Sequence, residues 1–199
     1  MKWILIGLIS LSLTSFKFIN KPTFGQSSKW VITQNSSLTV NGSTNVNKFS
    51  CVILQYPKMD TVNVTQDKNN KIVLSGSLNI EVKNFDCNNI MMTKQLRRTL
   101  QDEKYPFLRI KFLSLKEMPG VDQEKSFIKG NVEINIAGVP KRFEICYQLK
   151  MKNTSMELIG LQPINFSDFN LVPPKKIGKL IQAKDKLIVA FFLKMELVN

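Results

Sequence analysis

The most regular alternation of apolar and polar residues lies in residues 126–151. Before a turn at residues 137–140, every second residue falls on one face of a strand: Ile128, Gly130, Val132, Ile134 and Ile136. After the turn the same period continues through Phe143, Ile145, Tyr147 and Leu149. A period of two predicts strands with one buried face and one solvent face. We therefore expect a β-hairpin that forms part of the wall of a larger sheet.

Strand-like patterns cover most of the chain from Trp30 onward. The other predicted strands are residues 30–32, 37–40, 49–55, 61–65, 71–82, 107–115, 154–161 and 186–198. The Asn-, Gly- and Ser-rich residues 41–47 predict a turn, and Gly76 predicts a bend or bulge inside its strand. Residues 164–178 include two prolines and are expected to be irregular.

One segment, residues 88–101, has a helical period instead. Asn88 or Asn89 is suited to cap its N-terminus, and two arginines near its C-terminus favour the helix dipole. We expect its Met- and Leu-rich side to dock on the sheet, with a mobile lid over a ligand as the alternative. The last strand, residues 186–198, is apolar on both faces, so the helix could cover its outer face.

Eight or nine strands and one short helix predict an all-β fold, either a closed antiparallel barrel or a sandwich. A barrel of about eight strands can hold one small ligand in its interior. The chain shows no internal repeat and no inter-domain linker. We therefore expect a single domain over residues 27–199.

The first 26 residues have the order of a secretory signal peptide. Lys2 precedes an apolar run at residues 4–13, and a polar stretch follows, with Gln26 as the expected cleavage position. The run is shorter than the roughly 20 residues that a membrane span needs, although an uncleaved amphipathic anchor is an alternative. The sequence thus predicts a periplasmic or secreted protein.

The net charge of +13 falls once this segment is removed. Without Lys2, Lys17 and Lys21, the chain from Ser27 has 25 basic against 15 acidic side chains, or +10. The basic residues are scattered along the strands, which is typical of a solvated surface and not of a nucleic-acid site. An anionic membrane surface is a better candidate partner. The densest basic cluster comprises Lys175, Lys176 and Lys179.

Three cysteines allow three disulfide pairings, and an exported protein meets oxidising conditions. Cys51 and Cys87 have similar settings, each near a phenylalanine at the end of a strand-like segment, whereas Cys146 lies within a strand. We predict a Cys51–Cys87 disulfide and a free Cys146.

The residues of common catalytic sites are missing. The chain has no histidine, which removes the commonest general base and metal ligand. The cysteines are too far apart for a metal or redox motif. The closest acidic pairs, Asp102 with Glu103 and Asp122 with Glu124, fall in predicted loops. We therefore expect neither catalysis nor a metal or other cofactor.

Several segments, in order, resemble the YceI-like domain family. The hairpin sequence GNVEINIAGVPK resembles that family's G-x-L-T-I-x-G-V-T-K hairpin, and KYPFLRIKF resembles its YP-x-I-x-F strand. The resemblance extends over residues 30–197 and includes Trp30, residues 37–40, residues 167–171 and the last strand.

The resemblance implies an exported lipocalin-like barrel that can hold a polyisoprenoid chain in an apolar tunnel. Members of the family typically carry histidines before the YP motif. This chain has no histidine, so the resemblance implies an apolar tail pocket but no recognition of a polar head group. The inward faces would then line the ligand, with simple core filling as the alternative for each residue. The candidate lining residues are Leu78, Ile80, Val82, Ile110, Phe112, Ile134, Ile136, Phe143, Ile145, Val189 and Phe191.

These observations lead to two functional hypotheses. The first is an exported, non-catalytic carrier of a long apolar lipid, in particular a polyisoprenoid. The second is a barrel filled by its own side chains that acts as a structural or interaction protein at the cell envelope. A cavity of a few hundred Å³ favours the carrier, and a solid core favours the second hypothesis. The sequence predicts no oligomeric state.

Overall fold

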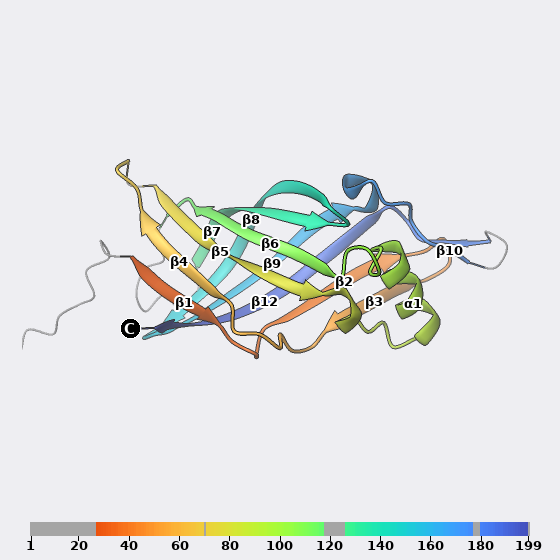
Figure 1. The fold of residues 1–199 in the computed structure, drawn as a ribbon, viewed down its shortest axis with the longest axis horizontal. Helices are drawn as coiled ribbons and strands as arrows, with labels where there is room; N and C mark the ends of the chain where they lie inside the picture. Colours follow the sequence, from red (N-terminus) through yellow and green to blue (C-terminus); the bar gives the residue numbers. More distant parts are fainter. Residues whose placement is uncertain (1–26, 70, 118–125, 177–179, 199) are drawn as a thin grey trace, which may run out of the picture.

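The computed structural model describes residues 27–69, 71–117, 126–176 and 180–198; the predicted signal segment, 1–26, lies outside them. These residues form an elongated β-barrel with one α-helix at one end (Figure 1). The helices are η1 (Val82–Asn84), α1 (Ile90–Thr99) and η2 (Phe166–Phe169). The strands are β1 (Ser28–Ile32), β2 (Ser37–Ser43), β3 (Lys48–Ile53), β4 (Thr61–Gln66), β5 (Ile72–Glu81), β6 (Phe107–Leu115), β7 (Ser126–Ile136), β8 (Val139–Lys152), β9 (Ser155–Asn165), β10 (Lys175–Lys176), β11 (Ile181–Gln182) and β12 (Lys186–Val198).

Eight strands close into an antiparallel ring in the order β1-β4-β5-β6-β7-β8-β9-β12, with β12 pairing back to β1. β12 pairs with β9 along nearly its whole length, from Lys186↔Asn165 to Glu196↔Ser155. Its last residues pair with β1, for example Lys29↔Val198. The prediction of an all-β barrel of about eight strands with one short helix is confirmed.

The β7–β8 hairpin shows how the alternating sequence becomes the barrel wall. Ile128, Val132 and Ile134 are buried, and their neighbours on the chain point away from the core. The turn consists of Ala137 and Gly138, whose φ angles are 50° and 79°. Two successive positive φ angles define a tight turn whose twist matches that of the strands. The turn is shorter than predicted, because the two residues after it already belong to β8.

The barrel closes differently at its two ends. β1 and β2 pair with successive stretches of β12, so a single strand of the wall contacts both. At the far end from α1, β1 also pairs with β4, which completes the ring. At the α1 end, β2 is followed by β3, and β3 pairs with no second full strand among the described residues.

A short bridge joins β3 to the rest of the barrel at the α1 end. The backbones of Val52 and Asp86 exchange two hydrogen bonds of 2.7 and 3.0 Å. As predicted, a disulfide joins Cys51 and Cys87, which are next to Val52 and Asp86 in the sequence. Cys146 is a free, exposed thiol. The bridge and the disulfide together close this end of the wall.

Helix α1 covers the end of the barrel, as Figure 1 shows beside β2 and β3. The Asn89 side chain caps the helix by accepting a hydrogen bond of 3.0 Å from the Met92 backbone N–H. Leu96 and Leu100 are buried and face the barrel interior. The helix does not cover the outer face of β12, whose outward side chains stay partly exposed. The helix follows β5 through the short η1 turn, which leads the chain over the end of the barrel.

Residues 164–176, the described part of the segment expected to be irregular, contain more regular structure than the prolines suggested. β9 continues to Asn165 because it stays paired with β12, η2 follows directly, and β10 pairs with β11. Residues 41–43 also extend β2, because they pair with β3. In both places strand pairing overrides the local turn signals: β9 pairs with the later strand β12, and β2 forms a hairpin with β3.

Candidate functional site

The barrel interior contains two apolar cavities that adjoin each other. The first lies midway along the barrel and the second beneath α1 and η2; each has a volume of about 50 Å³. Both are lined almost entirely by hydrophobic side chains. Four residues line both cavities: Leu38, Ile110, Ile134 and Val189. The cavities therefore form one apolar region in the half of the barrel that α1 closes.

The opposite half of the barrel is filled by its own side chains. Ile32 and Leu149 have no exposed surface, and Trp30 is almost fully buried. At the boundary between the halves, the rings of Tyr147 and Phe191 meet edge to face with centroids 5.4 Å apart. Burial raises the pKa of the Tyr147 hydroxyl, so this phenol stays neutral. The aromatic pair forms a floor between the first cavity and the filled half.

The structure places the eleven candidate lining residues in three groups. Eight line the first cavity: Leu78, Ile80, Ile110, Phe112, Ile134, Ile145, Val189 and Phe191. Ile136 lines only the second cavity. Val82 lines neither, because it is buried in η1. Phe143 also lines neither; its ring packs toward Phe169, with centroids 6.3 Å apart.

Sequence reasoning missed the residues that close the second cavity. Phe166 and Phe169 come from η2, and Phe85 comes from the loop after η1. None of them belongs to an alternating strand pattern, so period-two analysis could not place them. The spacing of Leu96 and Leu100 on α1 was visible in the sequence, but it does not say that the helix covers an open end.

Two polar side chains at the edge of the first cavity, Ser36 and Tyr56, are hydrogen-bonded within the protein. The buried Ser36 hydroxyl accepts a hydrogen bond of 3.0 Å from the Lys194 backbone N–H. The Tyr56 hydroxyl donates to the Asp60 carboxylate and accepts from the Asn79 backbone N–H at 3.2 Å. Burial, together with the bond to Asp60, raises the Tyr56 pKa. The Tyr56 bonds hold the loop between β3 and β4 in place, and the Ser36 bond holds the β1–β2 connection against β12.

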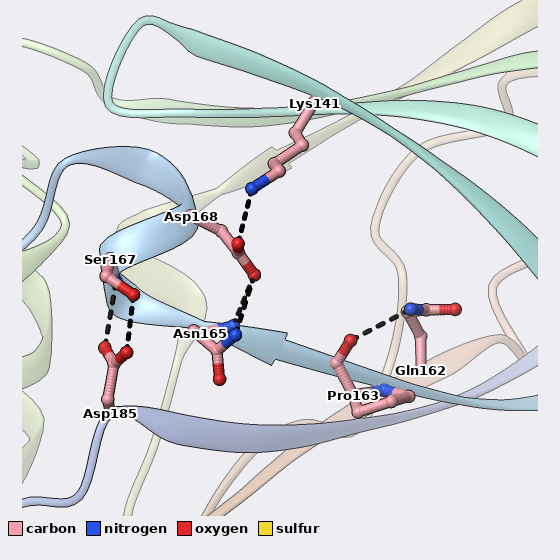
Figure 2. A network of polar contacts seen from close by, with 7 residues as sticks. All are labelled: Lys141, Gln162, Pro163, Asn165, Ser167, Asp168 and Asp185. Atoms are coloured by element: carbon pink, nitrogen blue, oxygen red, sulfur yellow. Dashed lines mark hydrogen bonds and ion pairs between the residues drawn. The ribbon is translucent and has the colours of Figure 1, made fainter.

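Helix η2 is fixed at the end of the barrel by the polar network in Figure 2. Asp168 accepts a hydrogen bond of 2.8 Å from the Asn165 backbone N–H and forms an ion pair with Lys141. The bond from Lys141 lowers the pKa of the Asp168 carboxyl. On the other side, the Ser167 backbone N–H donates to Asp185 at 2.9 Å. This network keeps the two η2 phenylalanines over the second cavity.

The Lys141–Asp168 ion pair also spans a place where two strands of the wall separate. β8 and β9 pair from Lys152↔Ser155 only as far as Tyr147↔Gly160. Beyond that point β8 remains paired with β7, while β9 remains paired with β12. Figure 2 shows Lys141 reaching from β8 to η2 across this region. Side-chain contacts therefore replace the main-chain ladder there.

The described residues contain no cluster of three or more His, Cys, Asp or Glu side chains that could hold a metal ion. In the same part of the chain, no helix combines the length and apolar character needed to cross a bilayer. The main feature of the barrel interior is its apolar lining, with Ser36 and Tyr56 hydrogen-bonded within the protein at its edge.

A closed eight-stranded antiparallel barrel with an apolar interior belongs to the lipocalin-like class. Among solved structures, BcnA of Burkholderia cenocepacia is 18% identical, with a TM-score of 0.58 over 80% of this chain and 96% of that chain. A polyisoprenoid-binding domain of Saccharophagus degradans, implicated in plant cell wall breakdown, is 10% identical, with a TM-score of 0.62 over 84% of this chain and 97% of that chain.

A YceI protein of Campylobacter jejuni matches less completely, at 16% identity and a TM-score of 0.44 over 67% of this chain and 78% of that chain. No family model and no curated protein matches the sequence. At these identities the likeness to the first two structures establishes the fold. The resemblance seen in the sequence is thus confirmed at the level of fold.

Proposed function

We propose that this chain is a non-catalytic binding protein that holds the tail of an apolar lipid, of the polyisoprenoid class, inside its barrel. The observation that carries the proposal is the pair of adjoining apolar cavities on one side of the Phe191 floor. The likeness in fold to a polyisoprenoid-binding domain supports the lipid class. Removing apolar surface from water would drive binding, at about 25 cal/mol per Å².

The two cavities are small, so the proposal requires that they widen when a lipid binds. Binding pockets usually measure about 300–1,000 Å³, whereas each cavity here has about 50 Å³. A long tail therefore enters only if lining side chains change rotamer or the wall expands. The region where β8 and β9 separate is suited to expansion, because side-chain contacts can rearrange without breaking a strand ladder.

The small volume also favours the second hypothesis, a barrel filled by its own side chains that acts as a structural or interaction protein. Lipid uptake distinguishes the two. We expect native mass spectrometry of the protein purified from its own cells to show a bound lipid that solvent extraction releases. Repeated absence of such a lipid, together with no uptake of an added isoprenoid alcohol by the purified protein, would support the filled barrel.

A matched pair of variants locates the bound tail. Val189 lies on the shared wall of both cavities, and Leu161 is exposed on the neighbouring strand β9. Val189→Phe should fill the interior and reduce isoprenoid binding about tenfold or more, equivalent to about 1.4 kcal/mol. Leu161→Phe should leave binding unchanged. Equal binding by both variants would place the ligand elsewhere.

We also propose that the protein acts in the periplasm or outside the cell, at an anionic membrane surface. The signal-like segment 1–26 and the net charge of +10 that remains after its removal, 25 basic against 15 acidic side chains, support this proposal. Exposed apolar side chains near α1, including Ile90 and Met91, would contact the lipid surface. N-terminal sequencing of exported material should begin near Gln26, and an intact Met1 would contradict export with cleavage.

A further inference from the structure

A surface groove runs along one side of α1, outside the barrel. It has a volume of about 490 Å³. Five of its lining residues repeat at helical spacing, and Pro174 closes the opposite side. The residues from α1 are Met91, Lys94, Gln95, Arg98 and Thr99. The groove is therefore built by one exposed face of the helix and the segment that leads into β10.

The groove is the outermost of four spaces that lie in series. A pocket of about 200 Å³ beneath α1 shares Gln95 and Pro174 with the groove. The same pocket shares Leu96 and Phe166 with the second barrel cavity. That cavity adjoins the first, so each space neighbours the next from the surface to the middle of the barrel. Figure 1 shows α1 at the end of the barrel where this series begins.

The chemistry of the lining changes along the series. Lys94 and Arg98 lie one helical turn apart in the groove, and both are exposed. Within the part of the chain that the structure describes, neither side chain forms an ion pair. The described residues that line the groove include no Asp or Glu. The inner cavities, by contrast, are apolar.

Lys94 and Arg98, which form no ion pair with a described residue, lie at the outer end of a series of spaces that becomes apolar inside the barrel. This arrangement fits a ligand with an anionic head and an apolar tail. A guanidinium group can bind two phosphate oxygens at once, and a lysine adds a further charge-assisted hydrogen bond. Exposed Ile90 and Met91 next to the groove suit the first part of a tail. An uncharged lipid would leave both cations without a partner.

We propose that the groove between α1 and Pro174 is the head-group site, and that it selects an anionic, phosphate-bearing lipid over the uncharged alcohol. This inference rests on the proposed function, because it assigns the tail to the barrel interior. The hydrogen bond of 2.9 Å from Gln95 Nε2 to the Lys175 carbonyl lies between the groove and the next pocket. The tail passes beside this bond or displaces it.

The test compares farnesyl monophosphate with farnesol on the purified, delipidated protein. Isothermal titration calorimetry should show the phosphate binding about tenfold more tightly at low salt. Added salt should weaken phosphate binding and leave farnesol binding unchanged, because salt screens exposed charges. Inorganic phosphate alone should bind far more weakly than farnesyl monophosphate. Equal affinity for inorganic phosphate would overturn the inference in favour of a free-phosphate site.

Two double variants with the same loss of charge complete the test. Lys94→Gln with Arg98→Gln should remove the preference for the phosphate and leave farnesol affinity unchanged. Lys150→Gln with Lys152→Gln, at exposed positions at the other end of the barrel, should keep the preference. Equal effects of both double variants would mean that net charge alone attracts the phosphate. If neither probe binds the unmodified protein, the proposed function itself fails.

Discussion

The ring of Phe191 occupies the space where a side chain on Gly160 would lie. The two residues are paired across β12 and β9, and a Cβ atom built on Gly160 would lie only 2.0 Å from Phe191 Cζ. The ring also contacts Tyr147 and lines the first cavity. The missing side chain of Gly160 therefore determines where the floor of the cavity lies.

Gly160→Ala should destabilise the protein by about 1–3 kcal/mol, because the new methyl group overlaps the Phe191 ring. In a Phe191→Ala background the same change should become neutral or stabilising, since alanine suits a strand interior better than glycine. Urea unfolding of the four proteins in this double-mutant cycle measures the coupling. Additive effects would show that the ring and the glycine do not constrain each other.

Phe191→Ala should enlarge the first cavity. We expect a loss of about 3 kcal/mol in unfolding free energy, the lower end of the range for buried Phe→Ala changes, because Phe191 is only partly buried. The enlarged apolar space should then bind a small apolar molecule such as benzene or xenon. Phe192→Ala, on the outward face of the same strand, serves as the control and should cost less. A similar cost at both positions would contradict the role of Phe191 as the floor.

Loss of the Cys51–Cys87 disulfide should weaken the α1 end of the barrel. The two cysteines are 36 residues apart in the sequence, which corresponds to about 4 kcal/mol in the chain-entropy description of disulfides. Replacing both with serine should lower the urea midpoint and speed amide exchange at Val52 and Asp86. Cys146→Ser should change neither quantity. Unchanged exchange at the bridge would show that its two hydrogen bonds suffice.

The Lys141–Asp168 pair should make stability depend on acid pH. The hydrogen bond from Lys141 lowers the pKa of Asp168 in the folded state. A lowered carboxyl pKa stabilises the fold above the unfolded value of about 3.9, and this contribution disappears as pH falls through the folded value. Asp168→Asn should thus be less stable than the parent at pH 7, with the difference shrinking below about pH 4.

Urea midpoints measured between pH 7 and pH 3 check this prediction. Glu103→Gln provides the control, because Glu103 is exposed and forms no ion pair among the described residues. The control should follow the parent at every pH. A constant difference between Asp168→Asn and the parent over the whole range would contradict the linkage.

Local patterns predicted the barrel wall well because alternation records which face of a strand is buried. The inward residues of the β7–β8 hairpin are buried as expected, and the register of β5 shifts next to Gly76, where a bulge was predicted. Which strands pair, and how far the pairing extends, also depends on residues that are far apart in the sequence. For this reason the sequence could not show that β1 and β2 share β12, or that β9 continues to Asn165.

The candidate site was predicted only where strands form it. Ile110 and Ile134 lie on the cavity wall, as their alternation implied. Phe169 lies in a short helix without a repeating pattern, and its place over the cavity depends on the Lys141–Asp168 contact. The alternation of residues predicted that Phe143 lines the ligand site. However, the pairing of β8 with β9 ends at Tyr147 and does not extend to Phe143, which lines neither barrel cavity.

The uneven closure of the barrel has a kinetic consequence. At one end β1 closes the wall with strand ladders to both β12 and β4, whereas at the other end β3 is joined to the segment after β5 by a two-bond bridge and one disulfide. Local opening therefore begins at the α1 end and requires no global unfolding. Because the series of spaces starts at that same end, a ligand that enters the barrel as proposed would pass the part of the wall that opens with the fewest broken strand contacts.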